Sequence, residues 1–444
     1  MSFSKLLSSA LFAAVLAGLC ASSARAQKKD NKAPLAPVAP APATPFSDVR
    51  RDNLLNGFQV ISLERVSEPL LKCEIVLRAG ALFDLTDKTG LATLTQAALM
   101  AVNPRVKDEF ESLNAKLAWG VTTDTTWFHI ESPPGNFDAV MEILARLLIV
   151  ETVRTDAFKR AQQDTLDKLK AAQPTLAERA DEAFLRALYG VHPYGHNLIG
   201  STPTITAMKQ GDLYDFHKRF YMGNNAFAVV TGPVKHERIM RTFKTFFGGW
   251  IKGAIVQPTF RAPARVEQLN FVKLEAAEAA MVELRGGVLG VRLTDGDYLA
   301  VELLARVLAA RLNRAGVAGV TIHHPARVLA APFYFTATAA ADQAQALSRQ
   351  VTDAFAALAT AEITADELAA AKAALTGEFA AHPIEQSLRD IEAFKLAKNW
   401  PLTLNKSISD LTAVELRRVA KRLFEANALT VVALGRVNEL KSQF

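Results

Sequence analysis

The sequence predicts an α+β protein made of two similar domains, each with an antiparallel-rich sheet and helices packed on one side. Hairpin-like pairs of short strands alternate with long amphipathic helices, and this layering is typical of α+β proteins. In addition, two sequence patterns occur twice in the same order. Half of the 444 residues are hydrophobic and 22% are charged, as expected for a globular protein.

The two repeated patterns are apolar strands that end in glycine. Residues 77–87, LRAGALFDLTD, resemble residues 284–295, LRGGVLGVRLTD, at an offset of 207 residues. Residues 225–234, NAFAVVTGPV, resemble residues 427–437, NALTVVALGRV, at an offset of 202–203 residues. Two matches in the same order at nearly the same offset indicate a duplicated domain of about 200 residues, a period too long for a solenoid repeat.

The N-terminal residues predict a secretory signal peptide. Lys5 precedes an apolar run over residues 6–20, and Ala24-Arg25-Ala26 forms a small-x-small cleavage site. A lipoprotein signal at Cys20 and a mitochondrial transit peptide fit less well, because Leu19 is bulky and the segment has one arginine and an unbroken apolar centre. We therefore expect a periplasmic or secreted protein with no membrane span in the mature chain.

The remaining patterns predict the order of the segments. Residues 27–46 are rich in proline and alanine, which is typical of a mobile linker. Ordered structure is expected to begin with a strand–turn–strand pattern whose turn is Asn56-Gly57. The expected order is a signal peptide at 1–26, a linker at 27–46, an N-terminal domain at 47–250, a connection at 251–268 and a C-terminal domain at 269–444.

Charge and cysteine content exclude several classes of protein. The formal net charge is +6, but residues 1–32 supply +4 of it, so the rest of the chain carries about +2. This charge is too small for a nucleic-acid-binding surface, and no basic stripe is interleaved with aromatic residues. Cys73 is the one cysteine after the signal peptide, so it is expected to pack inside a strand and not to form an internal disulfide.

The spacing of histidines predicts no zinc site. His192 and His196 are four residues apart, but Pro193 and Gly195 lie between them and disfavour a helix. The adjacent histidines of IHHPA, residues 322–326, would point in different directions on a strand and have no third ligand near them in the sequence. No phosphate-binding glycine loop, dinucleotide fingerprint or serine-hydrolase elbow is present.

Several segments together resemble the pitrilysin/insulinase (M16) metallopeptidases in their small two-domain form. The resemblance covers about residues 50–440 and depends on the order of the segments, since no single one is diagnostic. It implies two homologous α+β domains. The segments are LNGFQV, VLRAGALFDLTDKTGLATLTQAALM, HPYGHNLIG, DLYDFHKRFYMGNNAFAVVTGPV, ITADELAAAKAALTGEF and ISDLTAVELRRVAKRLF.

The resemblance implies a degenerate zinc site. Active members carry His-x-x-Glu-His on the helix that here reads GLATLTQAALM, with the histidines on zinc and the glutamate activating water. Thr93 and Ala97 stand at the two histidines, Gln96 stands at the glutamate, and Lys168 matches a third ligand, a glutamate on a later helix. Threonine is a poor zinc ligand, alanine has no ligand atom, glutamine is no base, and lysine is a cation. The resemblance therefore implies no catalytic residue, no metal and no cofactor.

Two other features of the family correspond to segments of this chain. Residues 117–123, LAWGVTT, match an edge strand that pairs with peptide substrates, which implies Trp119, Gly120 and Val121 as substrate-binding residues. Trp119 replaces a small residue, so it either narrows the cleft or is simply buried in the sheet. An Arg/Tyr pair of active enzymes corresponds to the region of Arg311, but its tyrosine is missing and the nearest one is Tyr334.

These observations predict a non-catalytic subunit of a heterodimeric metallopeptidase. Its partner would be a zinc-bearing M16 peptidase subunit, whose chamber it would close while it helps to bind unfolded peptides. The alternative is a stand-alone peptide-binding or chaperone-like clamp without hydrolysis. An active peptidase with another metal arrangement is the least favoured hypothesis, because no His-x-x-Glu-His or its reverse occurs in the sequence.

Overall fold

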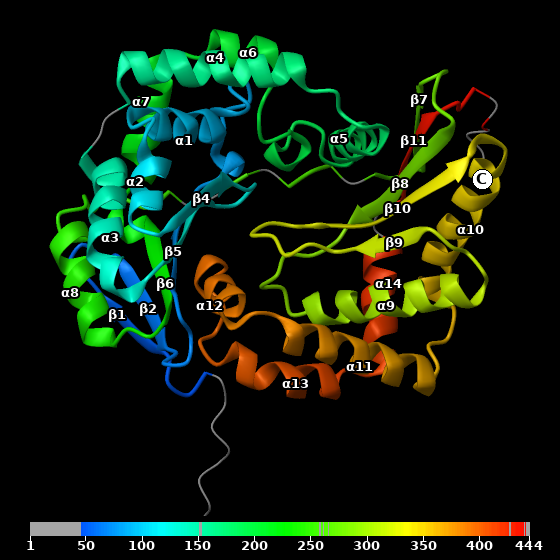
Figure 1. The fold of residues 1–444 in the computed structure, drawn as a ribbon. Helices are drawn as coiled ribbons and strands as arrows, with labels where there is room; N and C mark the ends of the chain where they lie inside the picture. The colour runs from blue at the N-terminus through cyan, green and yellow to red at the C-terminus, as the bar shows by residue number, and fades with distance from the viewer. Residues whose placement is uncertain are drawn as a thin grey trace, which may run out of the picture. The chain divides into compact units, whose positions relative to one another are not determined.

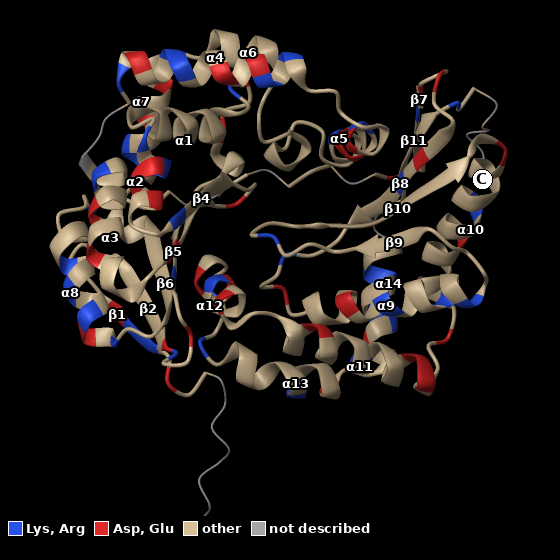
Figure 2. Cartoon of the chain, viewed as in Figure 1, with Lys and Arg blue, Asp and Glu red and all other residues tan. Residues whose placement is uncertain are grey.

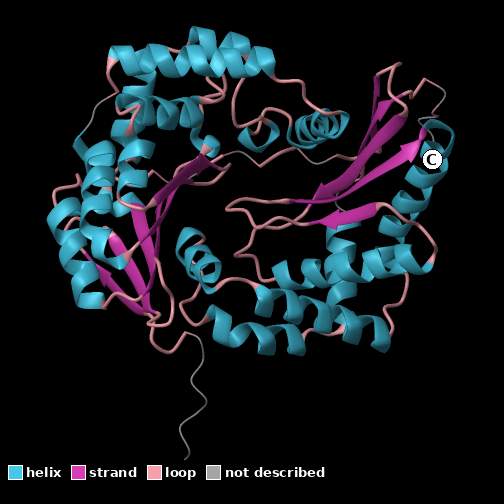
Figure 3. Cartoon of the chain, in the orientation of Figure 1, coloured by secondary structure: helices cyan, strands magenta, loops and turns pink. Residues whose placement is uncertain are grey.

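Two mixed β-sheets, each with its own layer of helices, form the described part of the chain (Figures 1 and 3). The structure is a computed structural model that describes residues 46–150, 153–256, 259–260, 262–264, 266–425, 428–438 and 440. The predicted signal peptide and all of the predicted linker except residue 46 lie outside these residues. No helix among them has both the length and the apolar character needed to cross a membrane.

The first sheet has the strand order β1-β2-β6-β3-β5-β4. The elements of this half are β1 (Arg50–Asn53), β2 (Gln59–Glu64), β3 (Leu71–Leu77), η1 (Ala81–Phe83), α1 (Leu91–Val102), α2 (Val106–Ser112), β4 (Lys116–Val121), β5 (Thr126–Ser132), η2 (Pro134–Asn136), α3 (Phe137–Ala145), the π-helical turn η3 (Arg146–Val150), α4 (Thr155–Ala171), α5 (Leu176–Tyr189), η4 (Pro193–Gly195), α6 (Thr202–Ala207), α7 (Gln210–Phe220), η5 (Gly223–Asn225), β6 (Ala226–Gly232) and α8 (His236–Phe247).

The second sheet has the strand order β7-β11-β8-β10-β9. The elements of this half are β7 (Asn270–Glu275), β8 (Met281–Leu289), α9 (Tyr298–Arg314), β9 (Val320–His323), β10 (Pro332–Ala340), α10 (Ala341–Thr360), α11 (Ala365–Ala381), α12 (Ile384–Ala393), α13 (Trp400–Asp410), α14 (Ala413–Glu425) and β11 (Thr430–Gly435). The predicted limits of the N-terminal domain (47–250), the connection (251–268) and the C-terminal domain (269–444) stay predictions.

The second sheet repeats the topology of the first. The order β2-β6-β3-β5-β4 recurs as β7-β11-β8-β10-β9, with one parallel pair in the same place in each sheet, so the predicted fold class is confirmed. The glycines that end the repeated strands, Gly232 and Gly435, have φ angles of +132° and +146°. A Cβ atom at Gly232 would lie 2.7 Å from the Cα of Leu71, and one at Gly435 would lie 2.6 Å from the Met281 oxygen. Both glycines therefore allow the start of a neighbouring strand to approach closely.

One face of each sheet packs against helices of its own half. In the first sheet Cys73 and Phe128 are fully buried in a core with residues of α1, α3 and α8, as the sequence predicts for Cys73. Burial also raises the pKa of the Cys73 thiol, which disfavours a reactive thiolate. In the second sheet Leu284 and Phe335 are buried against α9, α10 and α14.

The other face of the second sheet is covered by α5, which comes from the first half of the chain (Figure 1). Phe184 and Leu188 of α5 form a buried cluster with Val432 of β11. Arg285 of β8, with a side chain that is 4% exposed, forms an ion pair with Asp181 of α5 and another with Glu283 at 2.9 Å. Helix α5 is thus held on the second sheet by both apolar contacts and a buried guanidinium.

Helix α12, from the second half of the chain, packs in the same way on the first sheet (Figure 1). Leu388 is fully buried with Ile61, Val76 and Phe227 of that sheet. Glu392 of α12 pairs with Arg51 of β1 at 3.2 Å, and the same residue's carbonyl oxygen accepts a hydrogen bond from Arg78 at 3.1 Å. Each half therefore supplies one helix to the sheet of the other half.

We expect Arg285→Ala to lower the free energy of unfolding by about 3 kcal/mol, because it leaves two carboxylates beside an apolar interface without their partner. The measurement is urea unfolding at neutral pH. Arg186→Ala is the control, since Arg186 lies on the same α5 and its ion pair with Glu182 is exposed. The control should lose about 0.5 kcal/mol or less. Equal losses in the two variants would show that the buried ion pair does not hold α5 in place.

Candidate functional site

Helix α1 carries three of the four positions at which the sequence predicts a degenerate zinc site. It begins after Gly90, whose φ is +93°, and the Asp84 carboxylate accepts the N–H groups of Gly90 at 2.7 Å and Ala92 at 2.8 Å. Burial raises the pKa of Asp84 to about 7, although these two N–H donors oppose the shift. The first turn of α1 is therefore fixed by a buried carboxylate.

Thr93 and Ala97 both face other parts of the protein. The Thr93 hydroxyl donates a hydrogen bond to the carbonyl oxygen of Leu198 at 2.5 Å. The same loop approaches α1 at Gly90, where a Cβ atom would lie 2.6 Å from the Ile199 oxygen. The methyl group of Ala97 packs against the hydrophobic core of the first half. Thr93 thus ties the helix to the 198–200 loop, and Ala97 contributes apolar contact alone.

Gln96 links α1 to the neighbouring pair of strands. Its side chain is buried, with 3% of the residue exposed. Its amide nitrogen donates to the carbonyl oxygens of Gly120 on β4 at 3.1 Å and Trp127 on β5 at 3.3 Å. An amide can donate to two carbonyls in this way, whereas a carboxylate cannot.

Lys168 lies on the exposed side of α4. The opposite side of α4, which includes Ala161 and Thr165, is buried, and Arg160 of α4 donates to the Ala101 oxygen of α1 at 2.9 Å. Charged side chains of both signs follow one another along α4 (Figure 2). Across the described ranges, no three His, Cys, Asp or Glu side chains are grouped so that they could hold a metal ion.

A zinc ion does not fit the four side chains at this place. Zinc in proteins is bound by imidazole nitrogen, thiolate sulfur or carboxylate oxygen. Here the side chains are a hydroxyl and an amide that already donate to carbonyl oxygens, a methyl group and an ammonium group. No zinc-dependent step is compatible with this set.

Strand β4 contains the predicted substrate-binding residues and lies at the end of the first sheet. The backbone N–H of Thr122 donates to the backbone oxygen of Thr125 at 2.7 Å, so these two residues form a hydrogen-bonded pair. Along an antiparallel ladder, hydrogen-bonded pairs alternate with pairs whose N–H and C=O groups point away from the neighbouring strand. The N–H and C=O groups of Val121 and Trp119 consequently point away from β5. Gly120 is in the ladder, and a Cβ atom there would lie 2.6 Å from the Trp127 ring. Among the described strands β4 pairs with β5 alone, so it has a free edge.

The Trp119 side chain is half-buried. It packs against the hydrophobic core of the first half, and the Lys107 ammonium lies 4.9 Å from the centre of its ring. This cation–π contact and the core packing fix the indole on the side of the sheet that faces α1 and α2. The free backbone groups of β4 point along the plane of the sheet, so they and the indole lie in different directions.

A cavity of about 610 Å³ adjoins the 198–200 loop. Leu198 and Tyr334 line it, so the tyrosine nearest to the expected Arg/Tyr position faces this space. Tyr194 also lines it, and its hydroxyl donates to Asp124 at 2.6 Å and accepts the N–H of Leu329 at 3.0 Å. Tyr194 is the central residue of the motif HPYGH, between His192 and His196. Tyr194 therefore joins the β4–β5 turn to the second half, a role that the sequence did not reveal.

Arg311 does not line this cavity and is engaged in a structural ion pair. Its guanidinium contacts both carboxylate oxygens of Glu367, at 2.9 and 2.8 Å, and donates to the Glu362 oxygen at 2.6 Å. These hydrogen bonds from Arg311 lower the pKa of Glu367 to about 2. Arg311 thus joins α9 to α11.

Two models of protein families match the sequence. The model of the insulinase family, peptidase family M16, matches residues 59–202, and the model of the inactive domain of M16 peptidases matches residues 207–375. An uncharacterised zinc protease of Mycobacterium leprae is 21% identical over 215 residues, which make up 48% of this chain and 46% of the relative. The zinc protease PqqE of Helicobacter pylori is 22% identical over 209 residues, 44% of this chain and 45% of the relative. The chain spans about half the length of these curated relatives.

Other matches extend over more of the chain. The beta subunit of the mitochondrial-processing peptidase of Caenorhabditis elegans is 20% identical over 283 residues, 62% of this chain and 60% of the relative. A crystal structure of an M16 inactive domain from Pseudomonas fluorescens has a TM-score of 0.79 at 20% identity, covering 88% of this chain and 99% of that one. The first half of the periplasmic protease PqqL from Escherichia coli has a TM-score of 0.73 at 15% identity, covering 89% and 93%. At these identities, the solved structures support the fold alone.

We expect Arg311→Gln to lower the free energy of unfolding at neutral pH by about 1–3 kcal/mol, because it removes a bidentate partner of a buried carboxylate. The depressed pKa of Glu367 makes this contribution fully present above about pH 4.5, and it is lost as the pH falls towards about 2. Urea unfolding over this pH range measures both effects. Arg314→Gln is the control, since that side chain is 67% exposed and makes a single 3.1 Å contact with Glu367. A loss for Arg311→Gln that does not change with pH would contradict the assignment.

Proposed function

Because the chain belongs to the M16 peptidase family in its small two-domain form, we propose that it is a zinc-less subunit of a heterodimeric peptidase. The observation that carries this proposal is the state of the four positions at the degenerate site. Thr93 and Gln96 donate to backbone oxygens, Ala97 packs against the core and Lys168 is exposed, so none supplies a ligand or a general base. The peptide bond would be cleaved by a zinc-bearing M16 partner.

The names of the relatives support a complex of a zinc-less subunit with a zinc-bearing partner that cleaves the peptide bond. Two relatives are named zinc proteases, and a third is named as one subunit of a processing peptidase. A scaffold that keeps its two sheets while its α1 carries no zinc ligand suits a subunit that shapes its partner's chamber. The interface would have to seal a cavity, which places it in the obligate class of about 2,000 Å² or more.

The free edge of β4 supports a role in binding substrate. The outward N–H and C=O groups of Trp119 and Val121 can pair with an extended peptide, and such pairing depends little on the peptide's sequence. An unfolded polypeptide is therefore the substrate class that this edge suits. We also propose that the protein acts outside the cytoplasm, since residues 1–26 have the pattern of a signal peptide and the similar PqqL is described as periplasmic.

We expect this chain to co-elute in gel filtration with an exported zinc-bearing M16 relative from the same organism. The purified chain alone should contain far less than one zinc per molecule and should not cleave unfolded peptides, because its α1 has no ligand set. The relative's peptidase activity should fall sharply when this chain is absent. Elemental analysis, gel filtration at micromolar concentration and peptide cleavage measure these three expectations.

A variant with Thr93→His, Gln96→Glu, Ala97→His and Lys168→Glu is the matched control, since it should gain zinc. About one zinc per wild-type chain, or cleavage that a chelator stops, would overturn the zinc-less assignment. If the relative cleaves at its full rate alone and the two do not co-elute, the subunit role is wrong. The stand-alone peptide clamp then becomes the better hypothesis.

We expect Val121→Pro to weaken the binding of an unfolded peptide about tenfold, because proline removes an N–H group that β5 does not use. The fold should stay intact, since the ladder between β4 and β5 keeps its hydrogen bonds. Fluorescence anisotropy with a labelled unfolded peptide measures the affinity. Trp119→Phe is the control, because it changes a side chain on the same strand and keeps every backbone donor. Equal affinities of the proline variant and the wild type would argue against strand addition at β4.

A further inference from the structure

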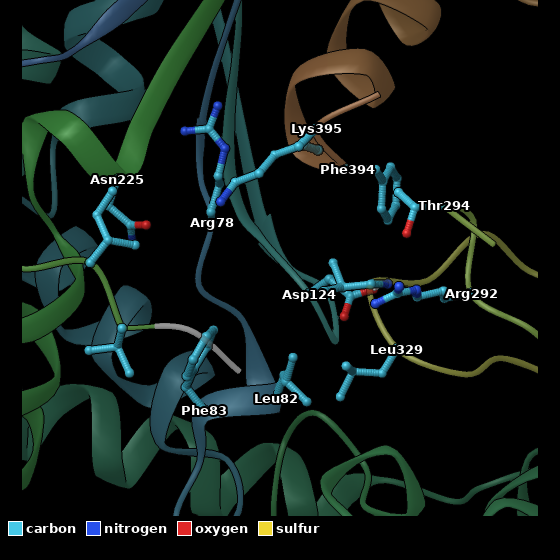
Figure 4. A pocket seen from close by; sticks show the side chains of 14 residues that line it. Arg78, Leu82, Phe83, Asp124, Asn225, Arg292, Thr294, Leu329, Phe394 and Lys395 are labelled. Carbon is cyan, nitrogen blue, oxygen red and sulfur yellow. Dashed lines mark hydrogen bonds between the residues drawn. The ribbon is translucent and has the colours of Figure 1, made fainter. Parts of the chain in front are cut away.

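A second cavity, of about 340 Å³, lies between the β4–β5 turn and the segment that follows α12 (Figure 4). Its volume is at the lower end of the range for small-molecule sites, about 300–1,000 Å³. Three of its lining residues are cationic, namely Arg78, Arg292 and Lys395. Figure 4 shows Arg78 and Lys395 on one side of the cavity and Arg292 on another. The cations thus surround the space and do not form one exposed patch.

Among the described residues these three cations make no direct ion pair, although the Glu392 carboxylate, which is paired with Arg51, interacts with Arg78 at longer range. In the described part of the chain, no carboxylate lies within ion-pair distance of Arg78, Arg292 or Lys395. The Arg78 guanidinium donates to neutral oxygens, those of Glu392 (main chain, 3.1 Å) and Gln59 (side chain, 3.4 Å), and lies 4.7 Å from the Phe227 ring centre. A partly buried guanidinium without a direct ion pair is unusual, because desolvation of a charge is costly.

Asp124, the one carboxylate among the described residues that line this cavity, is already engaged. Asp124 accepts the Tyr194 hydroxyl at 2.6 Å and the Val328 N–H at 3.4 Å. Burial raises the pKa of Asp124, although these two donors and the Arg327 guanidinium oppose the shift. Three cations therefore face one carboxylate among these lining residues, so the wall carries an excess of positive charge.

The backbone at Lys395 is held in a conformation that normally selects glycine. Its φ is +55°, and the N–H of Leu396 donates to the Ile391 oxygen at 2.9 Å, as at the end of a helix that closes with a left-handed residue. A lysine at this place costs free energy that a glycine would not. A strained residue that directs a charge towards a cavity is typical of a binding site.

We propose that this cavity binds an oxyanion that is attached to an apolar group. Arg78, Arg292 and Lys395 supply the positive charge, and the apolar wall, to which Phe83 and Phe394 belong, receives the rest of the ligand. The free carboxylate of a peptide's C-terminal residue and an organic phosphate share this chemistry. The proposal is independent of the proposed subunit role, because none of its residues belongs to β4 or to the degenerate zinc site.

The test is isothermal titration of the full chain with three probes: acetyl-Leu-Phe with a free carboxylate, its C-terminal amide, and phenyl phosphate. At least one anion should bind with saturation, and the amide should bind at least about tenfold more weakly. Binding of the free acid alone identifies a peptide C-terminus as the ligand, and binding of the phosphate alone identifies an organic phosphate. No saturable binding of either anion, or equal binding of the acid and the amide, overturns the proposal.

Variants locate the site. Lys395→Gly and Arg292→Gln should each weaken binding of the anion about tenfold, since each removes a charge-assisted contact. Lys395→Gly should not lower the melting temperature, because glycine suits the left-handed backbone, so a loss of binding cannot be attributed to unfolding. Lys398→Gln is the control, as that lysine lies in the same segment outside the cavity. Unchanged affinity in both test variants would overturn the assignment.

Discussion

The packing of one helix from each half on the sheet of the other half is the constraint on which the rest of this structure depends. Each sheet has one face covered by its own helices, so its second apolar face needs another cover. Helix α5 covers the second sheet and α12 covers the first. At both interfaces an arginine with little exposure reaches the helix, Arg285 towards Asp181 and Arg51 towards Glu392. Neither half can bury its sheet fully alone, which explains why the described residues form one compact unit.

The packing of the two halves on one another also fixes the position of the β4–β5 hairpin. Its turn carries Asp124, which Tyr194 and the N–H of Val328 hold from two other segments. The hairpin is therefore fixed at its tip while the edge of β4 stays free along its length. An edge that is already in position would lose little conformational freedom on pairing with the proposed peptide, and such preorganisation favours binding. The cation-lined cavity lies at the same turn, so its shape too depends on the packing of the two halves.

The fold could be predicted because its signals are local. The Asn56-Gly57 turn is present, with Gly57 at a φ of +85°, and long helices such as α4 alternate with short strands, as the sequence predicts. Other features could not be predicted, because periodicity shows that a face is buried and not what buries it. The packing of α5 on the second sheet and of α12 on the first sheet is one feature that could not be predicted for this reason. The left-handed Lys395 carries no sequence signal at all, since glycine is the residue that normally marks such a position.

The contacts of Thr93 and Gln96 also show how the residue types at these two positions suit their surroundings. A glutamate at position 96 in this structure would place a carboxylate beside the carbonyl oxygens of Gly120 and Trp127, and acceptors that face one another repel unless a proton or a metal lies between them. Glutamine has the same shape and donates to both oxygens. The Thr93 hydroxyl likewise satisfies the Leu198 oxygen. These residues therefore stabilise α1 against the β4–β5 pair and the 198–200 loop, which keeps the free edge of β4 in place.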